Sequence, residues 1–365
     1  AKAQPTCLMK AFRIRQLNAS TITMTQPAIL RQRRAFLALT GRLALAAGCA
    51  PLSWAAGANP RIKAPKKKLL LDTDIGSDID DAVALAYIVM QPDIDLLGIT
   101  TATGESVKRA ALARQITRQV GLDIPVIPGL EAPRVIAQRQ LVAQQAIELP
   151  QTVRQTLPRD HNPEAAIDFM VDTIRSNPGE VTLLAVGPFT NIARLLERAP
   201  GISKLLHEIV IMGGKYSDYP TPWGPTEWNA IVDPHATSML FQLAECPIRA
   251  IGLDITWRLF MTPEKVRSEF KTHPLLQTVL AWSEVWFKER DLLHFHDPLA
   301  AACIVSPDLC TYSQGTVQVD LRNSKTAGIT TFTPDPSGPV QIAIDVDPDR
   351  FFSTFFTAFP VATRT

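Results

Sequence analysis

Five aspartates stand within the ten residues 72–81, directly after the apolar run 69–71. One aspartate between a strand and a helix could cap the helix, and a second could interact favourably with the helix dipole. Five like charges so close together repel one another unless a cation neutralises them. Carboxylates without histidine or cysteine nearby prefer a hard ion such as Ca²⁺ or Mg²⁺ to zinc. The spacing therefore predicts a divalent metal site, with a purely structural cluster as the alternative. The five residues are Asp72, Asp74, Asp78, Asp80 and Asp81.

Two other acidic motifs share part of this pattern and fit it poorly. A calcium-binding EF-hand loop requires a glutamate at its twelfth position, and counting from Asp72 places Val83 there. Phosphatases of the haloacid-dehalogenase type also open with a strand followed by Asp-x-Asp. They expect Thr or Val two residues after the second aspartate, where this chain has Gly76. Such a phosphatase, dependent on Mg²⁺, is the alternative enzyme hypothesis.

The residues that must position these aspartates alternate between short β-branched apolar runs and longer amphipathic stretches. This alternation predicts an α/β fold, with a single domain, a mostly parallel, open twisted sheet and helices on both faces. The predicted strands are 68–72, 95–101, 124–127, 181–186, 208–212 and 248–253. The predicted helices between them are 80–90, 106–120, 163–176, 191–198 and 234–245. The C-terminal part is helix-rich, with helices at 263–271 and 275–289, and ends with strands near 316–321 and 340–344.

The expected sheet also indicates where chemistry should occur. In open α/β sheets, ligands bind beyond the carboxyl ends of the strands. The aspartate cluster follows the first predicted strand, and other polar residues follow the later strands. We therefore expect the functional residues to gather at this edge of the sheet.

The composition is that of an ordinary globular protein. Of the 365 residues, 46% are hydrophobic and 20% are charged, which excludes full-length disorder. The first 71 residues carry thirteen Lys or Arg and no Asp or Glu, so all 35 acidic residues lie in the remainder. That remainder is acidic, which does not favour nucleic-acid binding. No apolar run in it approaches the length of about 18 residues that a transmembrane helix needs, so we expect no membrane span.

The basic N-terminal segment has the order of residues typical of an export signal. The pair Arg33-Arg34 precedes an apolar stretch rich in Ala and Leu, and small residues at 56–58 form a cleavage site. Paired arginines predict the twin-arginine route, and therefore a periplasmic location. Residues 1–58 are thus expected to be an N-terminal extension with a signal peptide. The alternatives are a disordered basic tail and a lipid anchor on Cys49, which stands in a loose lipoprotein box.

Three cysteines remain after this segment, and their odd number and spacing do not form a disulfide framework. Cys303 stands in an apolar helical stretch, so a buried free thiol is expected there. Proteins exported by the twin-arginine route generally fold before transport, which fits a scaffold without disulfides. The three are Cys246, Cys303 and Cys310.

Eight short segments, spread from residue 72 to residue 352, form a recognisable series of motifs. They are Asp72-Thr73-Asp74, Asp80-Asp81-Ala82, 186–193, Met212-Gly213-Gly214, Glu227-Trp228-Asn229, Asp233-Pro234, His296-Asp297 and 347–352. In this order they resemble the inosine–uridine-preferring nucleoside hydrolase family, and the aspartate motif is the most specific of them. The resemblance places a nucleoside hydrolase domain at residues 66–360.

The resemblance implies one Ca²⁺, which binds the ribose 2′- and 3′-hydroxyls and the attacking water. At the matching positions, Asp74 is a metal ligand and also the base that takes the proton of the water. Asp81 is a bidentate ligand. The backbone carbonyl of Val186 supplies a further ligand, and Asp297 completes the coordination shell.

The same resemblance implies how the substrate is held. Asp80 receives a ribose hydroxyl, Glu227 and Asn229 hold the ribose hydroxyls chiefly on the 5′ side, and His296 lies near the leaving base. Cleavage of a ribosyl C–N bond builds oxocarbenium charge, which carboxylates stabilise, and the base leaves poorly without a proton or a hydrogen bond. Plain structural alternatives exist for these positions. Asp297 could cap a helix, His296 could be a structural histidine, and the other pair could form a turn.

The chain departs from the family pattern around the sugar and the base. Glu105 stands where the family usually has Asn or Asp, and Thr221 where many members have Asn. The opening motif is two residues longer than its shortest form, which leaves Asp78 beside the ligands. The His-containing loop of several pyrimidine-handling members has no clear counterpart within 135–150. These departures leave the base of the substrate open. Aromatic residues available to stack on it are Trp223, Trp228, Trp257, Phe260, Trp282 and Trp286.

The sequence thus predicts an exported, Ca²⁺-dependent hydrolase that converts a ribonucleoside to ribose and a free base. Members of the family are commonly dimers or tetramers, so a homodimer or homotetramer is implied. A non-catalytic periplasmic nucleoside-binding protein is the alternative from a different class. Asp74 argues against it, because a binding protein has no use for a base.

Replacing both Arg33 and Arg34 by Lys is expected to keep the precursor inside the cell, because the twin-arginine receptor recognises both guanidinium groups. Cell fractionation followed by immunoblotting measures the distribution of the wild type and the double variant. A double variant that still reaches the periplasm would show that the signal is misassigned.

Overall fold

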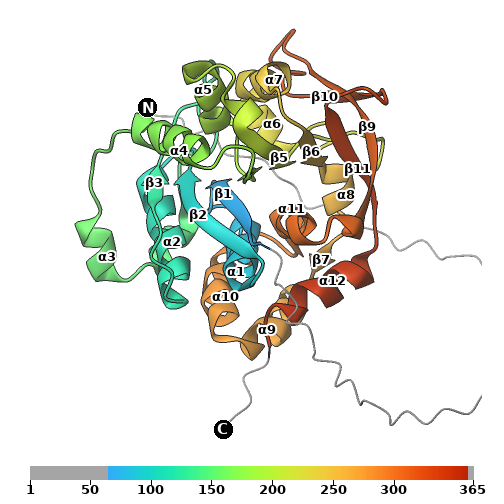
Figure 1. Ribbon diagram of the computed structural model, residues 1–365. Coiled ribbons are helices and arrows are strands. Elements are labelled where there is room, and N and C mark those ends of the chain that lie inside the picture. Colours follow the sequence, from blue (N-terminus) through green and yellow to red (C-terminus); the bar gives the residue numbers. More distant parts are fainter. Residues whose placement is uncertain (1–64, 361–365) are drawn as a thin grey trace, which may run out of the picture. The chain divides into compact units, whose positions relative to one another are not determined.

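The computed structural model describes residues 65–360, so the predicted signal peptide lies outside the described residues. A nine-stranded sheet lies at the centre of this part, in the order β10-β9-β11-β6-β5-β4-β1-β2-β3, and β7 and β8 form a separate pair (Figure 1). The strands are β1 (Lys67–Thr73), β2 (Ile94–Thr101), β3 (Val126–Pro128), β4 (Val181–Ala185), β5 (Leu206–Met212), β6 (Ile248–Ile251), β7 (Phe260–Met261), β8 (Leu293–His294), β9 (Cys310–Val319), β10 (Thr330–Pro334) and β11 (Val340–Val346).

The sheet is mostly parallel, as predicted. Every neighbouring pair from β11 through β6, β5, β4, β1 and β2 to β3 is parallel. β9 runs antiparallel to both of its neighbours, β10 and β11. β4 is buried along its whole length, and β1 is buried from Leu69 onward. Continuous apolar strands of this kind are typical of a sheet that is covered on both faces.

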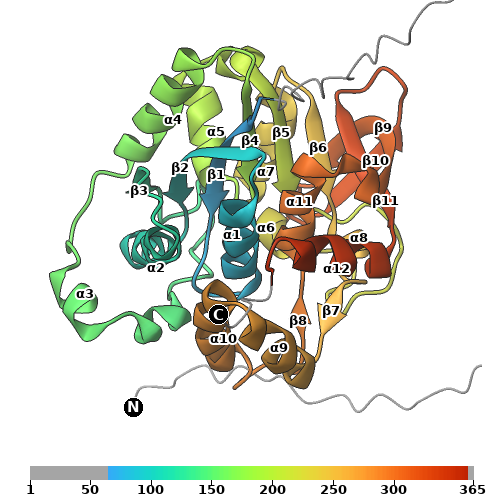
Figure 2. The same ribbon diagram turned by 60° about the horizontal axis from the view of Figure 1, so that its bottom comes forward.

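Helices cover both faces of the sheet (Figures 1 and 2). Buried residues of α1, α2, α10, α11 and α12 form one apolar core, and those of α4, α5 and α7 form a second. The helices are α1 (Asp80–Met90), α2 (Ser106–Gln119), α3 (Gln151–Thr156), α4 (Glu164–Ser176), α5 (Thr190–Arg198), α6 (Trp228–Val232), α7 (Pro234–Leu243), α8 (Leu253–Thr256), α9 (Pro263–Glu269), α10 (Pro274–Trp286), α11 (His296–Val305) and α12 (Pro348–Thr357). Short 3-10 helices are Gln144–Glu148, Ile202–Leu205, Phe270–Thr272 and Pro307–Leu309.

Most predicted elements are present, and the differences lie at their ends and in short elements that were not predicted. The predicted helix 80–90 has the observed bounds of α1. The strand predicted to reach residue 253 ends at Ile251, because the chain after Gly252 turns into the short helix α8. The strand predicted near 316–321 begins earlier and is β9, and its hairpin partner β10 was not predicted. The three cysteines are free and buried, as expected.

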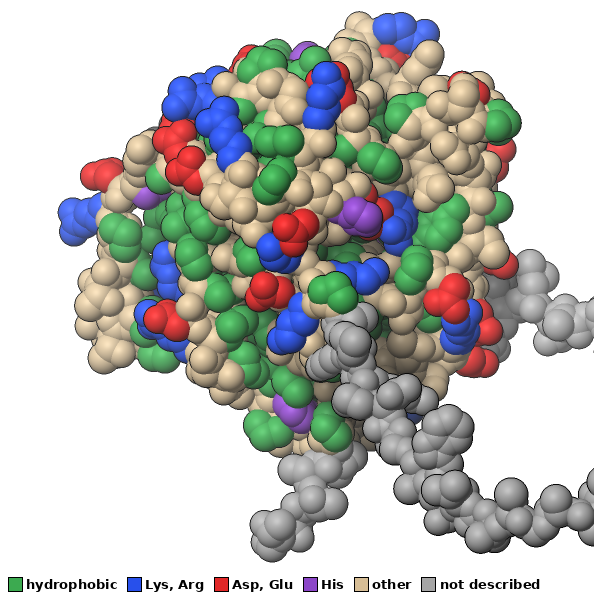
Figure 3. Space-filling view, in the orientation of Figure 1, with side chains coloured by type: hydrophobic (Ala, Val, Ile, Leu, Met, Phe, Trp, Pro, Cys, Tyr) green, Lys and Arg blue, Asp and Glu red, His purple; other side chains and the backbone are tan. Residues whose placement is uncertain are grey.

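The described part of the chain contains no helix that is long and apolar enough to cross a membrane. Acidic and basic side chains are interspersed on the face of the protein in Figure 3. Exposed charges of both signs that lie close together screen one another, so this face carries a mixed potential rather than a field of one sign.

The strand order reverses at β1. The strands β1, β2 and β3 follow one another in one direction, whereas β4 returns to pair with the other side of β1. The register pairs Asp72 with Ala185, so the loops that leave β1 and β4 start side by side. A reversal of this kind is where open α/β sheets bind ligands. The aspartate cluster emerges at this point.

Candidate active site

The loop after β1 brings Asp74 against the loop after β4. Gly187 permits this approach, because a Cβ atom there would lie 2.8 Å from both the backbone nitrogen and Oδ1 of Asp74. Val186, the preceding residue, donates its N–H to the Asp72 carbonyl at 2.9 Å. Its own carbonyl accepts a hydrogen bond from the Asn229 side chain at 2.8 Å. The structure thus places the two expected contributors, Asp74 and the Val186 carbonyl, on adjoining loops.

Three buried carboxylates meet where α1 and α11 begin. Asp80 and Asp81 open α1, and Asp297 lies in the first turn of α11. One carboxylate oxygen of each lies within 4.8 Å of those of the other two. The backbone N–H of Asp297 donates to Asp80 Oδ2 at 3.0 Å, across 217 residues of chain. The fold therefore brings together side chains that only the family resemblance had linked.

The electrostatics of this carboxylate trio fit a divalent cation. Burial and mutual repulsion raise the pKa of Asp80, Asp81 and Asp297 well above the ordinary value. A buried carboxylate without a compensating charge is costly in its ionised form, and three together are costlier. The donor atoms are all carboxylate oxygens, which suit a hard cation such as Ca²⁺ or Mg²⁺. A cation between them would offset both the burial and the repulsion.

Asp74 lies next to the trio and has further partners. Its backbone N–H donates to Asp81 Oδ1 at 3.2 Å, and its Oδ2 accepts a hydrogen bond from the Gln140 side chain at 2.6 Å. Burial raises the pKa of Asp74, while the charge of Arg109 and the Gln140 hydrogen bond lower it. Asp78 accepts a hydrogen bond from the next backbone N–H, and burial raises its pKa to about 6.

Asp72, the first aspartate of the cluster, is tied to the sheet. Its Oδ1 accepts hydrogen bonds from the Thr100 hydroxyl on β2 and the Asn191 side chain on α5. Burial raises its pKa to about 7. Of the five aspartates, Asp80 and Asp81 therefore belong to the trio and Asp74 lies beside it. Asp72 and Asp78 have other hydrogen-bond partners.

Glu227 and Asn229 lie at the start of α6, and their polar atoms have protein partners. The Glu227 carboxylate caps this helix, accepting from the backbone N–H groups of Asn229 at 2.7 Å and Ala230 at 3.0 Å. It also accepts from the Gly214 N–H at 2.8 Å. Burial raises the pKa of Glu227 to about 7 although these three bonds lower it. Glu227 thus caps a helix, where the structural alternative from the sequence was a turn, and the ribose contact stays a prediction.

His296 lies at the start of α11 within a series of stacked rings. Its Nδ1 is 2.7 Å from the Thr256 hydroxyl, and its ring centroid is 5.2 Å from that of His294. His294 in turn stacks on Trp257 at 3.7 Å. Burial, and then the neighbouring His294, lower the pKa of His296 well below its ordinary value. The lowered pKa favours the neutral imidazole, and the contact at Nδ1 leaves Nε2 for a ligand.

The aromatic residues expected near the base divide into two groups. Trp223, Trp228 and Phe260 are each about half exposed, and Trp223 packs edge-on against Trp257. Trp282 belongs instead to the apolar core and is 1% exposed, because α10 packs against α1. The expectation that Trp282 could stack on the base is therefore wrong. Trp223 and Phe260 adjoin the stacked rings through Trp257 and His294, whereas Trp228 donates its indole N–H to Gln140.

Two buried polar residues of the site, Gln140 and Arg109, were not predicted. Gln140 contacts Asp74 directly, and Arg109 donates to the Asp74 carbonyl. A lone glutamine in an irregular segment has no spacing that marks it. An arginine in an amphipathic helix is ordinarily exposed, and here it is 0% exposed.

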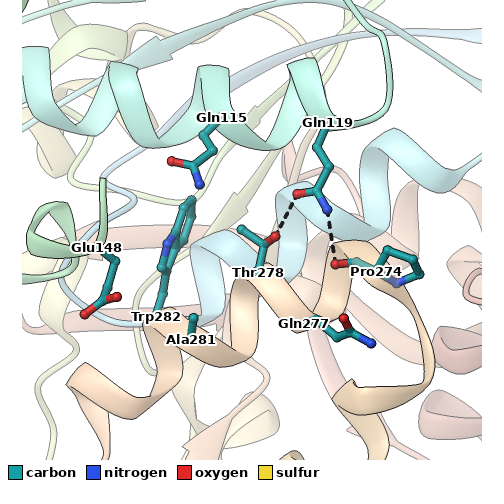
Figure 4. Close-up of a pocket in the computed structure, with 8 residues that line it drawn as sticks. All are labelled: Gln115, Gln119, Glu148, Pro274, Gln277, Thr278, Ala281 and Trp282. Carbon is teal, nitrogen blue, oxygen red and sulfur yellow. Dashed lines mark hydrogen bonds between the residues drawn. The ribbon is translucent and has the colours of Figure 1, made fainter. Parts of the chain in front are cut away.

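A pocket of about 440 Å³ lies elsewhere, between α2 and α10 (Figure 4). Gln119 spans it, accepting from the Thr278 hydroxyl at 2.8 Å and donating to the Pro274 carbonyl at 3.1 Å. Trp282 lines this pocket, but none of the expected catalytic, substrate-binding or metal-ligating residues does. We therefore treat the carboxylate trio and its surroundings as the candidate active site.

The chain is similar to known proteins over most of its length. Residues 69–353 match the family described as inosine-uridine preferring nucleoside hydrolase. The chain is 30% identical over 309 residues to the enzyme of that name from Leishmania major, covering 78% of this chain and 95% of the relative. It is 29% identical over 306 residues to a pyrimidine-specific ribonucleoside hydrolase of Escherichia coli, covering 79% and 95%. A solved purine-preferring ribonucleoside hydrolase from Gardnerella vaginalis superimposes with a TM-score of 0.67 at 27% identity, covering 80% and 98%.

Buried carboxylates at the switch point of a mostly parallel sheet define an α/β enzyme of the hydrolase class. The chain belongs to the inosine-uridine preferring nucleoside hydrolase family. Its relatives and structural neighbours are N-glycosidases, and this chain is an enzyme of the same kind. Family membership decides against both the phosphatase and the non-catalytic binding protein.

Without a cation, the stability of the protein is expected to fall as the pH rises from about 4 to about 8. A carboxyl group whose pKa is higher in the folded state than in the unfolded chain binds more protons when folded. Its contribution is complete below the unfolded-state pKa of about 4 and is lost as the pH passes the folded-state pKa, about 6 for Asp78 and about 7 for Asp72 and Glu227. Melting temperatures of chelator-treated protein across this range measure the trend.

Added Ca²⁺ or Mg²⁺ is expected to raise the melting temperature, and more at about pH 8 than at about pH 5, because ligand carboxylates bind metal only when deprotonated. Asp297→Asn should diminish this gain, whereas Asp308→Asn, at an exposed carboxylate beyond the other end of α11, should not. A melting temperature that neither cation changes at the higher pH would contradict a cation site.

Proposed function

We propose that this enzyme hydrolyses the N-glycosidic bond of ribonucleosides to ribose and a free base, and that it requires Ca²⁺. The observation that carries the proposal is the carboxylate trio at the helix starts of α1 and α11, with Asp74 beside it. Developing positive charge on a ribosyl group suits such a site.

The residues present suit Ca²⁺ for a physical reason. Ca²⁺ takes six to eight oxygen ligands in flexible geometry, whereas Mg²⁺ usually keeps several waters and binds one or two carboxylates. Asp74, Asp81, Asp297 and the Val186 carbonyl would hold the ion. When bound, Ca²⁺ would orient the ribose diol and make the attacking water more acidic.

The side chains divide the remaining tasks. Asp74 would accept the proton of the attacking water, since its carboxylate already adjoins the trio. Asp80 would accept a hydrogen bond from a ribose hydroxyl. Asn229 would contact the ribose from the α6 side, where its amide already bonds to the Val186 carbonyl. Glu227 fixes the start of α6 and would accept from the 5′-hydroxyl with an oxygen lone pair that its backbone partners leave unused.

His296 would act at the leaving base. In the tautomer whose Nδ1 accepts from the Thr256 hydroxyl, the imidazole carries its proton on Nε2. That N–H would donate a hydrogen bond to a ring nitrogen or oxygen of the base as the C–N bond lengthens, and the departing base would take its proton from water. The stacked series with His294 and Trp257 holds the ring plane in place.

Three further parts of the proposal have narrower support. Export to the periplasm by the twin-arginine route is supported by the order of residue types at positions 33–58. A homodimer or homotetramer is supported by the resemblance alone. The base stays open, because the relatives named above prefer inosine and uridine, pyrimidines or purines.

The experiment that tests the function is a ribose-release assay on a panel of purine and pyrimidine nucleosides, with and without a chelator. Free ribose that disappears with chelator and returns with Ca²⁺ supports the proposal. Phosphate release from nucleotides without ribose release, or binding without turnover, would overturn it.

Asp81→Asn is expected to weaken Ca²⁺ binding, because one negative charge leaves the coordination shell, and excess Ca²⁺ should partly restore turnover. Asp74→Asn should lose about 10²–10⁴-fold in kcat without such rescue, because the proton acceptor is lost too. Steady-state kinetics over a series of Ca²⁺ concentrations separate the two variants. Near-normal turnover of Asp74→Asn at any Ca²⁺ concentration would refute the mechanism.

His296→Ala is expected to cripple hydrolysis of natural nucleosides and to spare a nitrophenyl riboside. The nitrophenolate leaves as a stable anion and needs no hydrogen bond from the protein, whereas a nucleobase does. Both substrates have the same ribosyl group, so their Ca²⁺ dependence should change little. An equal loss on both substrates would make His296 a structural residue that orients Asp297.

A further inference from the structure

The segment 129–150 packs over the loop that carries the aspartates. Its regular structure is limited to the short 3-10 helix Gln144–Glu148, yet several hydrogen bonds attach it to that loop. Gln145 donates its backbone N–H to the Gly76 carbonyl at 3.0 Å and its side chain to the Ser77 carbonyl at 2.9 Å. The Ser77 hydroxyl donates to the Val142 carbonyl at 3.1 Å. The segment therefore has a fixed position relative to the aspartate loop.

A buried guanidinium joins the same two segments to α2. Arg109 is 0% exposed, and it donates to the Gly104 carbonyl at 2.8 Å, to the Val142 carbonyl at 3.2 Å and to the Asp74 carbonyl. A buried charge is costly unless its donors find acceptors, and here three loops supply them. Its positive charge also lies close enough to Asp74 and Asp81 to lower the pKa of both.

The turn after β2 attaches the segment at a third place. Thr103 and Glu105 have φ angles of 67° and 63°, which are uncommon for residues other than glycine. Gly104 lies between them, and a Cβ atom there would stand 2.6 Å from the Gln140 carbonyl oxygen. Glu105 accepts the backbone N–H of Ala143 at 2.9 Å. Glu105, which stands where the family usually has Asn or Asp, thus bonds to the segment 129–150, which also differs from the family pattern.

These attachments place the Gln140 side chain between two residues of the site. Gln140 is 7% exposed, and its Nε2 donates to Asp74 Oδ2 at 2.6 Å. Its Oε1 accepts the indole N–H of Trp228 at 2.5 Å. Both ends of the amide are therefore bonded, and the two contacts agree on which end is the oxygen. The other Asp74 oxygen, Oδ1, lies against Gly187, the residue that follows Val186.

We propose that Gln140 is a positioning residue for Asp74, held by Trp228 on one side and by the Arg109 and Glu105 attachments on the other. It engages one oxygen of the carboxylate and so keeps the other directed to the Val186 side of the site. This inference rests on the proposed function, because it assigns Asp74 to the cation and the water. Gln140 belongs to the segment 129–150, in which the His-containing loop of several family members has no clear counterpart.

If Gln140 only stabilised the segment 129–150, its replacement would have different effects. Its loss would lower stability and would affect binding of every ligand alike. A positioning residue for the water-activating carboxylate should lower kcat more than it changes KM, because substrate contacts stay in place. It should also lower turnover equally for a natural nucleoside and for a nitrophenyl riboside, since both need the same water.

The experiment compares Gln140→Ala, the near-isosteric Gln140→Glu and Trp228→Phe with the exposed Gln144→Ala from the same segment. Outer contacts to metal ligands are typically worth about 10–100-fold in activity or metal affinity, and we expect losses of this size in kcat for Gln140→Ala. Gln140→Glu should lose more, because two carboxylates then face each other. Trp228→Phe should lose less, and its effect should largely vanish when Gln140 is already Ala. Gln144→Ala should match the wild type.

Calorimetric titration with Ca²⁺ supplies a readout that needs no turnover. Gln140→Ala should bind Ca²⁺ several-fold more weakly while its melting temperature without metal stays near that of the wild type. Wild-type kcat and Ca²⁺ affinity in Gln140→Ala would overturn the inference, as would a loss confined to natural nucleosides. If the wild type releases no ribose but binds Ca²⁺ more tightly than Gln140→Ala, the proposed function fails and the positioning role stands.

Discussion

The repulsion among buried carboxylates is the constraint on which the rest of this structure depends. Asp80, Asp81 and Asp297 converge from two helix starts, and their raised pKa values reflect burial and mutual repulsion. Burying three carboxylates together lowers the stability of the folded chain unless something compensates their charge. The family is metal-dependent, and a cation held beside these carboxylates would offset both the burial and the repulsion.

The architecture meets this constraint at one edge of the sheet. The switch point places the loops after β1 and β4 side by side, and Gly187 lets them touch. Both α1 and α11 begin there, so backbone N–H groups at their starts favour the negative side chains. Arg109 adds one buried positive charge behind Asp74. Backbone N–H groups and the Arg109 guanidinium thus compensate part of the negative charge. A bound cation would compensate the rest.

Much of this could be predicted from the sequence, for identifiable reasons. The helix from Asp80 and the alternation of strands and helices are local patterns, and they agree with the structure. The approach of Asp297 to Asp80 spans 217 residues, so the family resemblance supplied it and spacing could not. Gln140 and Arg109 could not be predicted, because their roles come from tertiary contacts of an irregular segment. Two- to five-residue elements such as β7, β8 and α6 also carry too few residues to show a period.

The most direct test of the central claim is a crystal structure of the protein grown with Ca²⁺, with the ion identified by its anomalous scattering. The account predicts one Ca²⁺ per chain, bound by oxygens of Asp74, Asp81, Asp297 and the Val186 carbonyl. An ordered site with the same side chains and no ion at saturating Ca²⁺, or an ion bound only elsewhere, would contradict it.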